Sequence, residues 1–263
     1  QSRYNTKMST DAKTVLEWTY EPKDLFEVSC TIDYLGGEIS IADGKVLGEF
    51  DGHYYDQGQE FRELVYIHVH AVFLAQQVQV HQDFKLSDAS MAREHSDGRR
   101  DVTVFVEPIT IKIKGGRVDI VTRNADGEVV RDTRAERLQK QQEFREKIAE
   151  LTPNDLALKR MLQSFRNALA DRDNLLIHLY EVRETLTSEF DSEANAKTAL
   201  SVSAADWSRF GRLANNEPIQ EGRHRGKHAG LRPANQSEFE WALAFVQRLI
   251  EAYVTTKAVG CAK

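Results

Sequence analysis

The chain has 263 residues, with 41 acidic side chains against 35 lysines and arginines, and therefore carries a formal net charge of −6. Hydrophobic residues make up 41% and charged residues 29% of the chain, a mixture that can build a core and excludes wholesale disorder. A mildly acidic chain with a pI of about 5.8 does not coat polyanions in general, so any binding of nucleic acid requires a local basic patch.

Cysteine usage and hydropathy exclude further classes of protein. Cys30 and Cys261 are the only cysteines, which argues against a disulfide framework and against a cysteine-based zinc site. The longest uncharged run, residues 64–82, contains three histidines and four glutamines and is too polar for a membrane helix. No signal peptide is visible, so we expect a cytoplasmic protein that has no membrane partner.

Residues 24–131 have the pattern of short strands. Ile109, Ile111 and Ile113 alternate with polar residues, and residues 65–73 alternate between hydrophobic and other side chains, as half-buried strands do. Turn dipeptides such as Asp-Gly and Gly-Gly separate these runs, and residues 114–121 are typical of a hairpin. The pattern predicts an antiparallel β-rich sandwich or open barrel in residues 1–131, with a sensing, binding or regulatory role.

From about residue 132 onward, the hydrophobic period is that of helices. Residues 132–151 predict a charged helical connector, and residues 152–263 predict a bundle of four amphipathic helices. The predicted fold class is therefore α+β, with a β-rich half followed by a helical bundle.

Capping signals indicate where the helices begin. Thr152 is the expected N-cap of the first helix of the bundle, with Pro153 at its first position. The second helix is expected at roughly 173–190. Capping boxes at Ser203 and at Asn235 predict the starts of the third and fourth.

A basic segment, residues 222–232, lies between the third and fourth predicted helices. It contains four lysines and arginines, two histidines and no acid. Its glycines allow a ligand close to the backbone, and the following helix start favours anions. Arginine suits bidentate contact with phosphate, and histidine exchanges protons near neutral pH. The segment therefore predicts a site for a phosphate-bearing ligand.

Within this segment, Arg223 is followed by the polar His224 and then, after three further residues, by His228. This spacing at the end of a helical bundle resembles the Arg-polar-x-x-x-His motif of HEPN ribonucleases (higher eukaryotes and prokaryotes nucleotide-binding domains). The resemblance covers about residues 152–256. It implies a metal-independent endoribonuclease in which His228 acts as general base or acid and Arg223 stabilises charge on the phosphate.

The same resemblance implies partners and a biological setting. His224, Arg225, Lys227 and Arg232 would bind the RNA backbone, and two copies would form a homodimer through the helical domain. Toxin-like activity or phage defence in bacteria is the corresponding role. No cofactor and no metal are implied, and the sequence contains no Walker A loop, dinucleotide fingerprint, nucleophile elbow or EF-hand pattern.

Two non-catalytic interpretations of the basic segment remain open. In the first, it is a solvated helix connection whose charges pair with Glu217, Glu221 and Glu238. In the second, it belongs to a non-enzymatic module that binds a nucleotide, RNA or a protein, and the bundle mainly dimerises.

A third alternative places chemistry in the β-rich half. His68 and His70, two residues apart on a predicted strand, would project together and supply two ligands of a metal-dependent hydrolase. We interpret them instead as histidines on the solvent face of that strand, because no carboxylate stands at a suitable spacing.

Overall fold

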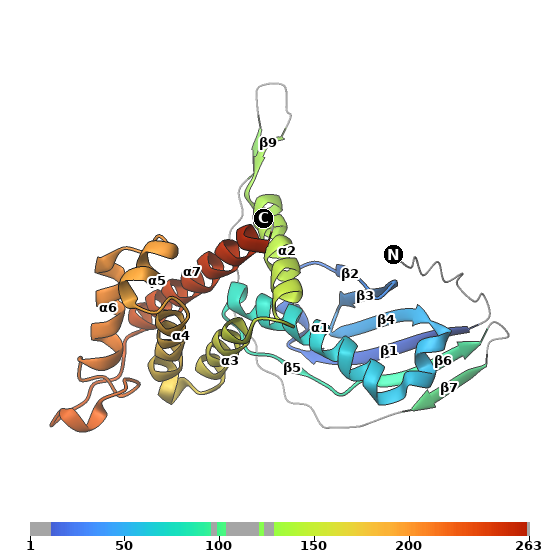
Figure 1. Ribbon diagram of the computed structural model, residues 1–263, viewed down its shortest axis with the longest axis horizontal. Helices are drawn as coiled ribbons and strands as arrows, with labels where there is room; N and C mark the ends of the chain where they lie inside the picture. The colour runs from blue at the N-terminus through green and yellow to red at the C-terminus, as the bar shows by residue number, and fades with distance from the viewer. Residues whose placement is uncertain (1–11, 96–98, 104–120, 124–128, 262–263) are drawn as a thin grey trace. The chain divides into compact units, whose positions relative to one another are not determined.

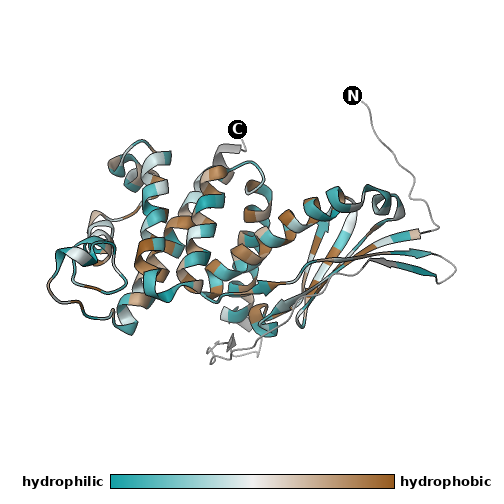
Figure 2. Cartoon of the chain, turned by 90° about the horizontal axis from the view of Figure 1, so that it is seen from below, coloured by the Kyte–Doolittle hydropathy of each residue, from teal (hydrophilic) through white to brown (hydrophobic). Residues whose placement is uncertain are grey.

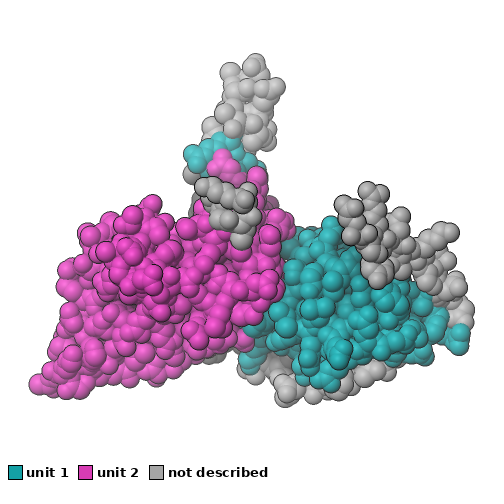
Figure 3. Space-filling model, in the orientation of Figure 1, with its two compact units in different colours: residues 1–70, 84–133 teal, residues 71–83, 134–263 magenta. Residues whose placement is uncertain are grey.

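The computed structural model describes residues 12–95, 99–103, 121–123 and 129–261 (Figure 1). The chain forms two compact units (Figure 3). Unit 1 comprises residues 1–70 and 84–133, and unit 2 comprises residues 71–83 and 134–263.

Unit 1 is built on an open antiparallel sheet in which the strand order is β2-β3-β4-β1-β6-β7, with β5 paired to the end of β1. Its strands are β1 (Ala12–Glu21), β2 (Cys30–Tyr34), β3 (Gly37–Ala42), β4 (Lys45–Asp51), β5 (Lys85–Leu86), β6 (Ser90–His95) and β7 (Arg100–Thr103). The α+β class and the antiparallel N-terminal half are confirmed. These seven strands form one open sheet, however, and not a closed barrel.

The central strand β1 shows why these residues form a sheet. Leu16, Trp18 and Tyr20 are at most 2% exposed, whereas Glu17 and Thr19 between them are exposed. This alternation places one row of side chains in the core and the other in solvent. Two neighbours, β4 and β6, pair with β1 along most of its length and satisfy its backbone groups.

Residues 65–73, predicted as a strand, lie instead in helix α1 (Gly58–Val80). Val65 and Val69 are fully buried one helical turn apart, and Ile67 between them is 49% exposed. A strand with Val65 and Val69 on its buried face would also have buried Ile67. The prediction was wrong because residues 71–78 are buried on all sides, which hides the helical period in the sequence.

A two-stranded sheet, β8 (Val121–Arg123) with β9 (Val129–Asp132), completes the described strands of unit 1. The predicted strand at residues 109–113 lies outside the described residues, as does the turn of the hairpin predicted at 114–121.

Unit 2 is helical, and its core is formed by the apolar faces of its helices. Figure 2 shows hydrophobic stretches alternating with hydrophilic ones along them. The helices are α2 (Thr133–Leu151), α3 (Leu156–Ala170), α4 (Leu175–Glu189), α5 (Glu193–Ala199), α6 (Ala204–Asn215) and α7 (Gln236–Cys261). The short α5 was not predicted.

Two of the predicted helix starts have the expected caps. The Ser203 hydroxyl accepts a hydrogen bond from the Asp206 N–H at 3.0 Å. The side chain of Asn235 accepts from the Glu238 N–H at 2.9 Å, and Glu238 accepts from the Asn235 N–H at 2.8 Å. The capping signals of α6 and α7 are therefore confirmed.

The predicted start of α3 was wrong by three residues. Thr152 donates its hydroxyl proton to the carbonyl of Ile148, at the end of α2. The N-cap is Asp155, whose carboxylate accepts from the Leu158 N–H at 2.8 Å. A threonine hydroxyl can bond to the carbonyl four residues earlier or to an N–H ahead of it, and here the carbonyl of the preceding helix takes it.

Arg183 on α4, one of the buried arginines of unit 2, lies against a glycine of α6. Its guanidinium donates to the Glu193 carboxylate at 2.5 Å and lies 4.9 Å from the centre of the Trp207 ring. A Cβ atom at Gly211 would collide with that guanidinium. With alanine at position 211, the end of the Arg183 side chain would have to shift.

Tyr253 on α7 donates its hydroxyl proton to the Asp155 carboxylate at 2.9 Å. Burial, followed by the hydrogen bond to Asp155, raises the pKa of Tyr253 above its ordinary value of 10.0. We expect Tyr253→Phe to lower the free energy of unfolding by about 1–3 kcal/mol near neutral pH, because Asp155 loses its donor.

The pH dependence of this effect follows from the raised pKa. The hydroxyl contributes its full stabilisation below the unfolded pKa of about 10 and loses it as the pH rises from there through the folded pKa. In urea unfolding, the difference between the wild type and Tyr253→Phe should therefore shrink from about pH 8 to about pH 11. An unchanged difference would contradict this coupling.

Candidate functional site

The basic segment, residues 222–232, forms a loop between α6 and α7 and is called the basic loop below. The N–H of Arg223 donates to the carbonyl of Ala214 at 2.8 Å, which ties the start of the loop to the end of α6. At its base, the Gln220 N–H donates to the Arg232 carbonyl and the Arg232 N–H donates to the Pro218 carbonyl. These bonds give the loop a defined backbone at both ends.

Arg223, the arginine of the predicted motif, is held against α4. Its guanidinium donates to the Glu184 carboxylate at 2.8 Å and lies 4.5 Å from the centre of the Tyr180 ring. The side chain is 30% exposed. Glu184 was not among the carboxylates expected to pair with the loop, because it stands 39 residues away in the sequence.

Arg232 is engaged by acids near the end of the loop. It makes two hydrogen bonds to the Glu238 carboxylate, at 2.6 and 2.8 Å, and one to Glu217 at 3.0 Å. The bond to Glu238 raises the pKa of Arg232, and the same bond lowers the pKa of Glu238. Glu221 accepts from the Ala234 N–H. Arg232, predicted to bind substrate, is thus part of an ion-pair network at the start of α7.

Arg225 binds neutral oxygens instead of carboxylates. Its Nη2 donates to the carbonyl of Asp173 at 2.7 Å and to Oδ1 of Asn174 at 2.6 Å, and its Nε donates to the Gly222 carbonyl. The oxygens of Asp173 and Asn174 both belong to the short 3₁₀ helix Arg172–Asn174 that precedes α4. Arg225 therefore fastens the basic loop to the N-terminal end of α4.

The remaining predicted residues keep unused polar groups. The side chains of His224 and Lys227 are exposed, and no hydrogen bond or ion pair within the described part of the chain engages them. His228 is half-buried, and its Nε2 is buried with no hydrogen-bond partner among the described residues. Over the same residues, no hydrogen bond or ion pair joins the side chains of Arg223 and His228. The side chains of His224 and Lys227 are therefore open to a ligand, whereas the unpaired Nε2 of His228 is enclosed by the protein.

A second group of polar side chains lies near the contact between Arg225 and the start of α4. It consists of Asp171 and Asn174, which precede α4, and of His178 and Glu181 on the helix. Nε2 of His178 is 3.5 Å from Oδ2 of Asp171, and Nδ1 of His178 is 3.6 Å from Oε2 of Glu181. The Asn174 amide donates to Asp171 at 2.7 Å. This bond, together with His178, lowers the pKa of Asp171.

The sequence prediction missed His178, although a signal for it exists. Arg172 is followed by the polar Asp173 and, six positions after the arginine, by His178. This is the same order of residue types as in the basic loop, with one more residue in between. Glu181 lies one turn after His178 on the same helix, beside Nδ1 of its ring.

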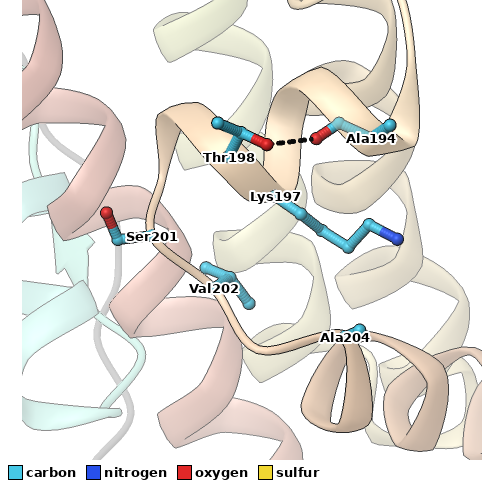
Figure 4. Close-up of a pocket in the computed structure, with 6 residues that line it drawn as sticks. All are labelled: Ala194, Lys197, Thr198, Ser201, Val202 and Ala204. Carbon is cyan, nitrogen blue, oxygen red and sulfur yellow. Dashed lines mark hydrogen bonds between the residues drawn. The ribbon is translucent and has the colours of Figure 1, made fainter.

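A cavity of about 380 Å³ lies beside the loop between α5 and α6 (Figure 4). Lys197 is the one charged residue among those that line it, and in Figure 4 it extends away from Ser201. The Thr198 hydroxyl is already used by the Ala194 carbonyl. Because no polar groups converge there, we do not place the site in this cavity.

A second cavity, of about 470 Å³, lies along the C-terminal half of α4. Tyr180 and Glu184 line it, and these are the two residues that hold Arg223. Arg183, Asp191 and Glu193 also line it. Arg223 is therefore anchored at the lining of an acidic cavity.

The two histidines of the metal alternative do not form a pair. Residues two apart on a helix point in directions roughly 200° apart, and both histidines lie on α1. The ring of His68 stacks on Tyr34 at 4.0 Å, and burial lowers the pKa of His68. The ring of His70 lies 5.8 Å from Phe84. Throughout the described residues, no three His, Cys, Asp or Glu side chains are arranged to hold a metal ion.

Comparison of the chain with protein-family models, with curated proteins and with solved structures gives no match. Among the helices that the structure describes, none combines the length and the apolar character needed to cross a membrane.

Proposed function

We propose that unit 2 is a metal-independent endoribonuclease that holds an RNA phosphate at the basic loop. The observation that carries this proposal is the chain of contacts from the loop to His178. Arg225 donates to Asn174, Asn174 donates to Asp171, and Asp171 faces His178. The loop that carries the positive charge is thus joined through Arg225 to a histidine with acidic partners, and acid–base cleavage of RNA needs both kinds of group.

The two histidines divide the proton transfers. His178 takes the proton of the 2′-hydroxyl at Nε2, in place of its contact with Asp171, because Nδ1 is buried beside Glu181, and this carboxylate stabilises the charged imidazole. The 2′-oxygen attacks the phosphorus, and the bond to the 5′-oxygen breaks. His228 protonates the departing 5′-oxygen. The products are a 2′,3′-cyclic phosphate and a 5′-hydroxyl.

The cations of the basic loop bind the phosphate. Arg223 lies against Tyr180 and Glu184, and its guanidinium suits contact with two phosphate oxygens. Lys227 and His224 are exposed and contribute attraction along the RNA backbone. Arg225 and Arg232 act indirectly in this proposal, because their guanidinium groups already hold the loop in place.

The proposal extends to partners and setting. The HEPN resemblance suggests a homodimer through unit 2, with unit 1 as the sensing or regulatory part, in a toxin or phage-defence protein of the bacterial cytoplasm.

A second candidate function is a phosphate-binding module without catalysis. It is favoured by the contacts of Arg223, Arg225 and Arg232, each of which already bonds to a protein group. Such a module would bind RNA or a nucleotide through Lys227 and the two loop histidines and leave it intact.

The test is cleavage of a single-stranded RNA in EDTA, with identification of the product ends. We expect Arg223→Ala to lower the rate by about two to three orders of magnitude and His228→Ala by about two to four. His53→Ala in unit 1, which removes a histidine paired with Asp51, is the matched control and should cleave like the wild type. Unchanged cleavage in both loop variants would contradict the site, and binding without cleavage by the wild type would establish the second candidate.

A further inference from the structure

Glu184 occupies the guanidinium that the proposed site needs for phosphate. We propose that Glu184 is an internal competitor, so that RNA binds by exchanging this carboxylate for a phosphate oxygen at Arg223. The inference rests on the proposed phosphate site and adds a residue that sets its affinity and its choice of ligand.

Arg223 is the arginine of the basic loop whose partner can be exchanged one for one. Its guanidinium has a single hydrogen-bonded acceptor in the described structure, the Glu184 carboxylate at 2.8 Å. Arg225 is held by three oxygens of neutral groups, and Arg232 by two carboxylates and a carbonyl. Replacing either of those sets would undo the anchoring of the loop, whereas replacing Glu184 would not.

Glu184 is placed to leave without disturbing the fold. Its side chain is 53% exposed, and it lines the cavity of about 470 Å³ along α4. Because the carboxylate of Glu184 is exposed, water hydrates it when it dissociates from Arg223. Exposed ion pairs also contribute little net stability. The exchange is therefore cheap enough for a ligand to drive.

Arg223 would stay in position after the exchange. The Tyr180 ring lies 4.5 Å from its guanidinium carbon, and its backbone N–H is bonded to the Ala214 carbonyl at 2.8 Å. Cation–π contact and a fixed backbone both persist when the carboxylate leaves. The phosphate would therefore bind a guanidinium that is already oriented.

The competitor favours ligands that carry several phosphates in a row. A single small anion would only replace one carboxylate with another anion. An RNA chain that displaces Glu184 also gains the exposed Lys227 and His224, and each added cation strengthens the binding of a polyanion. Glu184 therefore selects against isolated anions and in favour of oligonucleotides.

The experiment measures binding of a fluorescein-labelled 2′-O-methyl oligouridylate of about twelve nucleotides, which 2′-hydroxyl attack cannot cleave, by fluorescence anisotropy. We expect Glu184→Gln to bind this probe about three to five times more tightly than the wild type, the size expected for one exposed ion pair. Glu240→Gln removes an exposed acid of α7 that has no ion pair within the described residues. It controls for the change in net charge and should gain less than twofold in affinity.

A double variant separates competition from general electrostatics. In the Arg223→Ala background, adding Glu184→Gln should change the affinity by less than about 1.5-fold, because the contested guanidinium is absent. A gain that persists in this background would overturn the proposal, as would equal or weaker binding by Glu184→Gln alone. Thermal unfolding of each variant checks that unit 2 remains folded.

Failure of this inference and failure of the ribonuclease proposal give different results. Tighter binding by Glu184→Gln with no RNA cleavage by the wild type would leave the competitor standing and remove the ribonuclease. Cleavage by the wild type with no gain in Glu184→Gln would do the reverse. Absence of binding in the wild type and in Glu184→Gln would overturn both.

Discussion

Replacement of His178 with alanine is expected to reduce RNA cleavage by about two to four orders of magnitude. The imidazole lies between Asp171 and Glu181, at 3.5 and 3.6 Å. Removing it takes away the group that we propose accepts the 2′-hydroxyl proton. The measurement is the single-turnover rate with enzyme in excess, so that changes in affinity do not enter.

Two comparisons make this result specific. RNA affinity should stay within about threefold of the wild type, because His178 acts on the proton and the basic loop holds the phosphate. Glu181→Gln keeps a group that can accept a hydrogen bond from Ser164 but removes the charge beside His178, and it should lower the rate by about tenfold. A full rate in His178→Ala combined with a lost rate in His228→Ala would move the acid–base chemistry to the loop.

Phe210→Ala is expected to lower the free energy of unfolding by about 3–5 kcal/mol. Phe210 on α6 is fully buried, and its ring centre lies 5.3 Å from that of Phe245 and 6.1 Å from that of Tyr180. Removing the ring leaves a cavity among large side chains on three helices, which cannot all close in on it. Domains are stable by only about 5–15 kcal/mol, so the loss is a large share of the total.

Chemical denaturation monitored by circular dichroism measures this loss. Phe210→Leu fills most of the same volume and should cost much less, about 1–2 kcal/mol. A loss below about 1 kcal/mol for the alanine variant would show that unit 2 repacks around the gap. Because Tyr180 also supports Arg223, the alanine variant is further expected to bind RNA more weakly than the leucine variant.

The sequence predicted those parts of the fold that depend on neighbouring residues. The caps at Ser203 and Asn235 are set by residues three positions ahead, and such signals are visible without any tertiary contact. The strand predicted at residues 65–73 failed for the opposite reason. The end of α1 is buried on all sides, so its sequence shows no helical alternation of hydrophobic and polar residues. Whether this segment forms a helix or a strand depends on the segments that pack around it.

The candidate site divides in the same way. The basic loop was visible as a concentration of positive charge, because its members are adjacent in sequence. Its partners were not, since Glu184 stands 39 and Asn174 stands 51 residues from the arginines they contact. His178 was overlooked because the sequence does not show that its ring lies beside Asp171, seven residues before it.

The contact between Arg183 and Gly211 links the evolutionary histories of two positions. A methyl group at 211 would meet the guanidinium where it now lies, so the end of the arginine side chain would have to shift. A homologue with a short side chain at 183 would have room for alanine at 211, which is also the better helix former. The two positions should therefore vary as a pair, arginine with glycine or a smaller residue with alanine. An alanine at 211 would thus mark, from sequence alone, a relative in which the buried charge has been lost.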